Sequence, residues 1–135
     1  MIKREAYMRQ IRPFITGDLI KVLTGLRRSG KSVMLELIQA ELKGQGISET
    51  QFVKLNFEDM GNASLCTAAA LRDDVLNKIS KINGKAYLFF DEIHEVMDWE
   101  KCVNSLRVEL DCDIYITVSN AKLLSGELAT FLAGR

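Results

Sequence analysis

The eight residues from Gly25 to Ser32 constrain the fold of this chain more than any other segment. They match the pattern G-x-x-x-x-G-K-[ST] at every fixed position, between a β-branched run (19–24) and an amphipathic stretch (32–42). Glycines at both ends let the backbone curl so that successive N–H groups point at an anion. The helix that begins near Lys31 adds the partial positive charge of its N-terminus. The segment therefore predicts a strand–loop–helix unit that binds phosphate, a P-loop or Walker A motif.

This loop predicts the ligand and the residues that hold it. We expect ATP or ADP, bound together with Mg²⁺. Lys31 is expected to reach the β- and γ-phosphates and to act in catalysis, and the Ser32 hydroxyl is expected to ligate Mg²⁺. The residues expected to contact the nucleotide are Gly25, Leu26, Arg27, Arg28, Ser29, Gly30, Lys31, Ser32 and Val33.

Two carboxylates, Asp91 and Glu92, follow the continuous apolar run at 86–90. Such a run is typical of a strand buried on both faces, and ligands of doubly wound sheets bind at the carboxyl ends of the strands. We expect Asp91 to hold Mg²⁺, as the acid of a Walker B motif does, and Glu92 to activate the attacking water. The alternative is that these acids only cap the helix that follows. Because a kinase has no water to activate, Glu92 favours hydrolysis over phosphoryl transfer to a metabolite.

Strand and helix patterns alternate along the chain. Apolar and β-branched runs predict strands at 19–24, 52–57, 86–90 and 114–118. Helical spacing predicts helices at 2–11, 32–42, 67–82, 99–110 and 122–132. This alternation predicts a three-layer α/β fold, in which helices cover both faces of a parallel sheet. The length of 135 residues suits one domain, residues 1–135, without a linker or an internal repeat.

Composition excludes several other classes of protein. Lys and Arg number 18, as do Asp and Glu, so net charge does not favour nucleic-acid binding. The cysteines Cys66, Cys102 and Cys112 have no CxxC spacing and accompany a single histidine, which indicates reduced thiols and no zinc site. No apolar run approaches the length of a membrane span or forms a signal peptide. We expect a cytoplasmic protein with no membrane partner.

With these motifs in place, the chain resembles the AAA-type ATPases of prokaryotes, in particular the AAA_14 family. In that family an N-terminal ATPase core precedes a DUF4143 region. The double arginine in the P-loop and the stretch at 119–127 are the most particular points of likeness. The resemblance implies a P-loop NTPase fold of the AAA/RecA-like type and an activity that hydrolyses ATP. It covers the motifs at 11–14 (IRPF), 24–32 (TGLRRSGKS), 56–59 (NFED), 90–94 (FDEIH) and 119–127 (SNAKLLSGE).

The resemblance also implies roles for residues outside the two motifs. Asn120 occupies the place of the catalytic sensor that reads the γ-phosphate. Arg135 occupies the place of an arginine finger that acts on a neighbouring subunit's ATP, which implies a homo-oligomer. Asn56 either pairs with Glu92 and holds its carboxylate away from the catalytic position, or simply caps the end of its strand. His94 is expected to be a packing or capping residue more than a contact to phosphate or water.

The sequence departs from the family pattern at two points. Val118 stands where the family has Gly, and the chain stops at Arg135, where the family continues into a fifth strand, a lid and C-terminal regions. We therefore expect a fragment, truncated after the fourth core strand, that lacks its C-terminal region as a partner and hydrolyses ATP weakly alone. A P-loop kinase, or a nucleotide-gated binding module without significant turnover, are the alternatives. The activity that such an ATPase drives cannot be read from these motifs.

Overall fold

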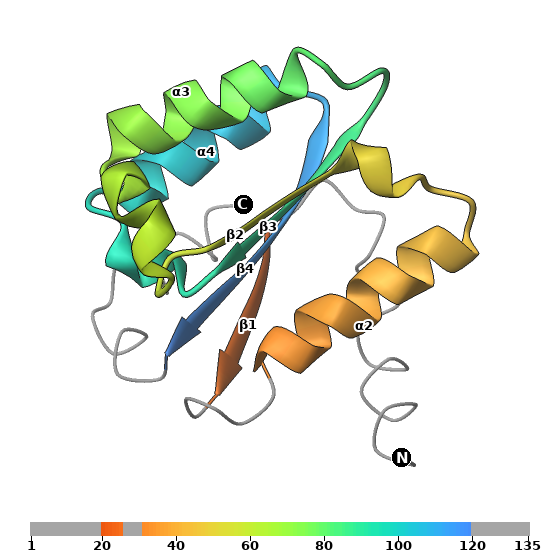
Figure 1. Ribbon diagram of the computed structural model, residues 1–135, viewed down its shortest axis with the longest axis horizontal. Coiled ribbons are helices and arrows are strands. Elements are labelled where there is room, and N and C mark those ends of the chain that lie inside the picture. Colours follow the sequence, from red (N-terminus) through yellow and green to blue (C-terminus); the bar gives the residue numbers. More distant parts are fainter. Residues whose placement is uncertain (1–19, 26–30, 120–135) are drawn as a thin grey trace.

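The structure of the protein is a computed structural model that describes residues 20–25 and 31–119. Strands and helices alternate through these residues, as the sequence predicts (Figure 1). The helices expected at 2–11 and 122–132 lie outside them. Within the described ranges the elements are β1 (Lys21–Gly25), α2 (Lys31–Gly44), η2 (Glu49–Gln51), β2 (Phe52–Asn56), η3 (Met60–Leu65), α3 (Ala68–Ile79), β3 (Ala86–Asp91), η4 (Ile93–Glu95), α4 (Trp99–Glu109) and β4 (Cys112–Ser119).

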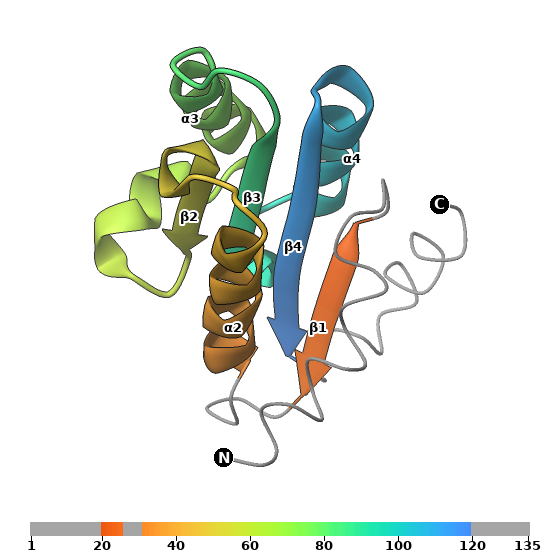
Figure 2. The ribbon, with the colours of Figure 1, turned by 90° about the vertical axis from the view of Figure 1, so that its right-hand side faces the viewer.

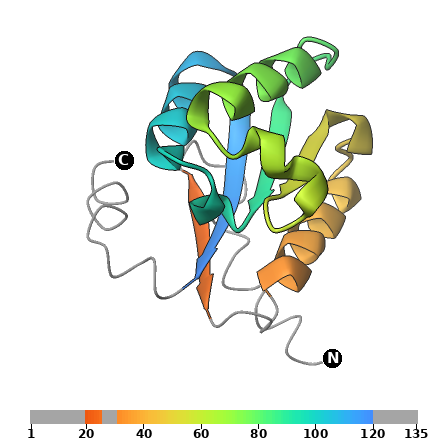
Figure 3. The ribbon, with the colours of Figure 1, turned by 60° about the vertical axis from the view of Figure 1, so that its left-hand side comes forward.

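The strands form a single parallel sheet in the order β1-β4-β3-β2. Figure 2 shows α2 in front of this sheet, and Figure 3 shows α3 and α4 side by side over the opposite face. The predicted three-layer α/β architecture is therefore confirmed. Because every pair is parallel, the carboxyl ends of all the described strands meet at one edge of the sheet.

The two faces of the sheet carry separate apolar clusters, since side chains of a strand alternate between faces. All of β3 is buried, as expected for a strand covered on both sides. Leu88 and Phe90 pack in the cluster under α3 and α4, whereas Phe89 belongs to the cluster under α2. There the rings of Phe89 and Tyr115 stack with centroids 5.1 Å apart. The α2 face is also the face on which the polar residues of the site lie.

The ends of the elements differ from the predicted ones by a few residues. The helix expected at 67–82 begins after Thr67, whose hydroxyl caps it by accepting from the Ala70 N–H at 3.3 Å. It ends at Ile79, because the following N–H groups of Lys81 and Ile82 bond three residues back and form a tight turn. β4 begins at Cys112, two residues before the predicted strand.

Candidate functional site

The carboxyl edge of the sheet brings together the ends of the segments that the motifs single out. Gly25 at the end of β1 pairs with Ser119 at the end of β4, and Asp91 at the end of β3 pairs with Asn56. α2 begins at Lys31 beside the end of β1, as Figure 2 shows. The strand–loop–helix unit predicted around the P-loop thus has its strand and its helix.

The nucleotide contacts predicted on the P-loop fall mostly outside the described residues. Residues 26–30, which join β1 to α2, lie outside them, and so do the side chains of Lys31 and Ser32. Val33 is described, and its side chain is largely exposed in the first turn of α2. The predicted roles of these residues therefore stay predictions.

Thr117 joins the two predicted acids through one hydroxyl group. In the register of β3 and β4, Phe90 pairs with Ile116, so Asp91 and Thr117 follow as neighbours on the α2 face. The Thr117 hydroxyl donates to Asp91 Oδ1 at 2.5 Å, and its oxygen accepts from the Glu92 N–H at 2.7 Å. Thr117 is fully buried, and Asp91 and Glu92 are each 7% exposed. The acidic pair is therefore held inside the protein rather than displayed on a solvated loop.

Glu92 adopts the left-handed region of backbone conformation, with φ 56° and ψ 51°. For a residue with a Cβ this conformation costs on the order of 1–3 kcal/mol, and such strain clusters at functional sites. The side chain makes no hydrogen bond that caps the following η4 turn. The Glu92 side chain therefore does not cap the helical turn that follows it, as the alternative interpretation would require.

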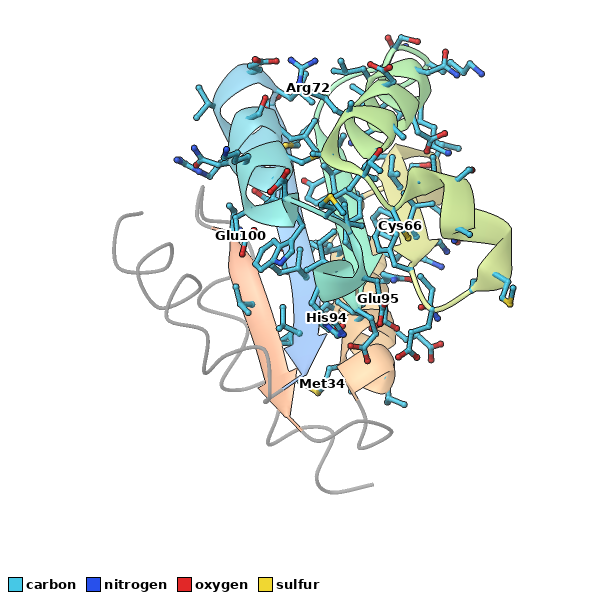
Figure 4. The ribbon with its side chains drawn as sticks, turned by 90° about the vertical axis from the view of Figure 1, so that its left-hand side faces the viewer. Met34, Cys66, Arg72, His94, Glu95 and Glu100 are labelled. Carbon is cyan, nitrogen blue, oxygen red and sulfur yellow. The ribbon has the colours of Figure 1, made fainter. Side chains whose placement is uncertain are left out.

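His94 lies against the Glu92 carboxylate. Its Nδ1 is 3.5 Å from Glu92 Oε1, its Nε2 is 3.6 Å from Glu95 Oε2, and its side chain is buried. The η4 turn creates this proximity, since the Glu95 N–H bonds back to the Glu92 carbonyl at 3.1 Å. Figure 4 shows His94 and Glu95 at the same end of the molecule as Met34, in the first turn of α2, and Arg72 at the other end. The His94 side chain is only 7% exposed, as that of a packing residue would be, and the group that it packs against is the candidate base.

The other residues considered from the resemblance are placed unequally. The Asn56 side-chain oxygen accepts from the Glu58 N–H at 3.0 Å, which is the strand-end cap and not a bond to Glu92. Val118 is fully buried in the cluster under α3 and α4. Asn120 and Arg135 lie outside the described residues.

Thr117 is the site residue that sequence reasoning missed. It sits between Ile116 and Val118 in an apolar run, where a Thr is an ordinary strand residue. Its relation to Asp91 appears only when the register of β3 and β4 is known. A threonine in the otherwise apolar run at 114–118 is the one signal that was present.

Fold and site together define an α/β P-loop domain with a buried acidic pair at the carboxyl edge of a parallel sheet. A family model described as an AAA domain, AAA_14, matches residues 18–135. The chain belongs to this family of AAA-type P-loop ATPases.

Two curated relatives resemble the chain along nearly all of its length. An uncharacterized protein of Haemophilus influenzae is 45% identical over 135 residues, which are 100% of this chain and 34% of that protein. An uncharacterized protein of Methanocaldococcus jannaschii is 36% identical over 138 residues, covering 98% of this chain and 28% of that protein. The chain thus spans about a third of the length of these relatives.

Two solved structures share the fold. The Aeropyrum pernix ORC1 protein, in complex with DNA, matches 96% of this chain and 42% of its own with a TM-score of 0.65 at 13% identity. Drosophila ORC, bound to AT-rich DNA and Cdc6, matches 96% of this chain and 52% of its own with a TM-score of 0.56 at 13% identity. At this identity the likeness concerns the fold. None of the helices within 20–25 and 31–119 is long and apolar enough to cross a bilayer.

Proposed function

We propose that this chain binds ATP with Mg²⁺ and hydrolyses it to ADP and phosphate. The observation that carries the proposal is the buried pair Asp91 and Glu92 at the edge where β1 leads into α2. Both residues are hydrogen-bonded to the Thr117 hydroxyl, an arrangement that we call the Thr117 clamp. Family membership and the complete Gly25–Ser32 motif support the same activity. A purely structural pair of acids would need neither burial nor a strained backbone.

Binding of the nucleotide is assigned to the P-loop. Backbone N–H groups of residues 25–33 and the Lys31 ammonium hold the phosphates. The residues present fit Mg²⁺, because this ion is commonly bound by one or two protein oxygens together with substrate phosphates. Asp91, whose carboxylate is already oriented by Thr117, and Ser32 would hold the ion, which neutralises charge on the β- and γ-phosphates.

Hydrolysis is assigned to Glu92. Its carboxylate accepts a proton from the water that attacks the γ-phosphorus, while the bond from that phosphorus to the ADP oxygen breaks. The Glu92 backbone is already in its left-handed conformation without ATP, and His94 lies beside the carboxylate. Asn120 as sensor of the γ-phosphate and Arg135 as arginine finger of a homo-oligomer complete the proposal.

We propose that the work driven by such an ATPase lies outside the matched domain, as in a protein of the relatives' length. The ORC structures that share the fold are complexes with DNA, but the balanced charge of this chain gives nucleic-acid binding no support. We propose that the remaining two thirds of a protein like its relatives receives the effect of ATP binding and hydrolysis. A cytoplasmic location fits such a role.

Phosphate release by the full-length protein, with MgATP and no added acceptor, tests this function. Lys31→Ala is expected to weaken ATP binding about 10–100-fold, because it removes a charged partner of the phosphates. Glu92→Gln is expected to retain binding and to lower kcat about 10²–10⁴-fold, the usual contribution of a general base.

The alternatives give different results in the same assay. A kinase would bind ATP but release little phosphate until a metabolite acceptor was added. A binding module gated by nucleotide would bind ATP tightly, would lose that binding in Lys31→Ala, and would release no phosphate under any condition.

A further inference from the structure

We propose that Thr117 is a positioning residue of this ATPase, because its one hydroxyl fixes both Asp91, the acid assigned to Mg²⁺, and Glu92, the acid assigned to activate water. The proposal rests on the proposed function and adds a third residue, on β4, to the site. Thr117 is fully buried and its hydroxyl is engaged by Asp91 and Glu92, so it acts through these two residues and not on the nucleotide.

The direction of both hydrogen bonds is fixed by chemistry. A backbone N–H can only donate, so the Thr117 oxygen must accept from Glu92. The hydroxyl then has one proton to give, and an ionised carboxylate can only accept it. Thr117 therefore orders the Asp91 carboxyl group through Oδ1, in a bond of 2.5 Å.

The bond to Glu92 replaces a ladder bond at the point where β3 leaves the sheet. Pairing of β3 with β4 runs as far as Phe90 and Ile116, and Glu92 already has a left-handed backbone. A side-chain oxygen from β4 receives the N–H that a continuing strand would have given to a carbonyl. The chain can then turn into η4 without leaving a buried donor unsatisfied, and this turn directs the Glu92 side chain.

A merely structural threonine would satisfy the buried N–H and affect stability alone. A positioning threonine also sets the geometry of both acids, so its loss changes the chemistry in a stable protein. Thr117→Val keeps the shape and removes the hydroxyl, whereas Thr117→Ser keeps the hydroxyl and removes a methyl group. Ile114→Val, on the same strand but in the apolar cluster of the other face, is the matched control for loss of packing.

The first measurement needs neither ATP nor Mg²⁺. In the full-length protein, amide hydrogen exchange at Glu92 is expected to accelerate at least about tenfold in Thr117→Val and to change little in Thr117→Ser and Ile114→Val. Unchanged protection in Thr117→Val would overturn the clamp itself, whatever the enzyme does.

The second measurement addresses the chemistry. Thr117→Val is expected to lower kcat and to raise the half-saturating Mg²⁺ concentration, each about 10–100-fold, the range for a partner that orients a metal ligand. KM for ATP should change little, and Thr117→Ser should restore most of both losses. Equal losses in Thr117→Ser, or turnover like the parent in Thr117→Val, would overturn the positioning role.

Failure of the proposed function has a different signature. If the parent protein binds ATP but releases no phosphate, the proposal of ATP hydrolysis is wrong. The effect of Thr117 on Asp91 is then tested by measuring ATP affinity with and without Mg²⁺. A strengthening of ATP binding by Mg²⁺ that is lost in Thr117→Val and kept in Thr117→Ser supports the role. The same strengthening in all variants overturns it.

Discussion

Burial divides the three cysteines into two kinds of thiol. Cys102 and Cys112 are buried, and this burial raises the pKa of each thiol to about 11. Cys66 is partly exposed beside η3. Because the thiolate is the reactive form, the two buried thiols are protected by both access and ionisation.

Thiol labelling of the native protein at pH 7.5 is therefore expected to modify Cys66 first. Cys102 and Cys112 should react at least about tenfold more slowly, because well under one thiol in a hundred is ionised when the pKa is about 11. Peptide mapping of the labelled protein measures each site separately. All three should react alike in denaturant, and rapid native labelling of Cys102 would contradict the buried core.

For single residues, the sequence was most informative where the type of residue fitted its place in a predicted element. Asp91 and Glu92 were found because two acids end an apolar strand. The position of the His94 side chain against Glu92 depends on the η4 turn. The two bonds of Thr117 depend on the register of β3 and β4, which brings Glu92 against a residue 25 positions further along the chain. Such relations between segments are not contained in any local pattern.

Among the elements, η2 connects the end of α2 to the edge strand β2 through Glu49. This carboxylate lies 2.7 Å from the Lys43 ammonium and 2.8 Å from that of Lys54. Hydrogen bonds from Lys43 and Lys54 lower the pKa of Glu49 from 4.5 to about 2. A depressed carboxyl pKa adds stability above pH 4.5, and this contribution is lost as the pH falls from 4.5 towards 2.

Titration of Glu49 by carbon NMR is expected to give a midpoint near 2 at low ionic strength. The side chains are exposed, so about 1 M salt should move the midpoint back towards the ordinary value. Lys54→Ala should also raise it, with Lys78→Ala, a lysine of α3, as the control. A midpoint near 4.5 at low salt would contradict the two ion pairs.

At the amino ends of the strands, opposite the functional edge, an ionic cluster around the buried Asp113 joins β1, β4 and the residue before β3. Asp113 Oδ1 on β4 lies 3.6 Å from Lys21 Nζ on β1 and 3.1 Å from Lys85 Nζ, just before β3. Burial lowers the pKa of Lys85, but the Asp113 carboxylate beside it outweighs this effect and raises the pKa. Asp113 is four residues, or about 13 Å along the strand, from Thr117.

Asp113→Asn is expected to destabilise the protein by about 3 kcal/mol, because it removes a carboxylate that lies against the buried Lys21 ammonium. Urea unfolding measures this loss. Asp113→Leu combined with Lys21→Met should recover part of it, since the pair removes the two most buried charges and leaves Lys85, whose side chain is 30% exposed. A change in ATP affinity, without a change in stability, would contradict the assignment of this edge to structure.

Sequence reasoning placed the regular elements well because their patterns are strong. The apolar run of β3 and the helical spacing of α4 identified both to within a residue. The short helices η3 and η4 were missed, since they have too few residues to show a period and are set by their turns and contacts. They are also the elements that follow β2 and β3 at the functional edge.

For the whole molecule, the parallel sheet explains why the site is where it is. Segments distant in sequence end at one edge because the strands run in the same direction, and α2 packs on the face that carries Asp91 and Thr117. The chain spans about a third of the length of its curated relatives.

The turnover of Glu92→Gln, compared with that of Glu95→Gln at saturating MgATP, tests most directly whether Glu92 is the catalytic base. Both substitutions remove one negative charge, but Glu95 is exposed on the far side of His94. We expect Glu92→Gln to bind ATP and to lose at least about 10²-fold in kcat, while Glu95→Gln stays within about threefold of the parent. Equal turnover in Glu92→Gln and in the parent would contradict the assignment of Glu92 as the base of an ATPase.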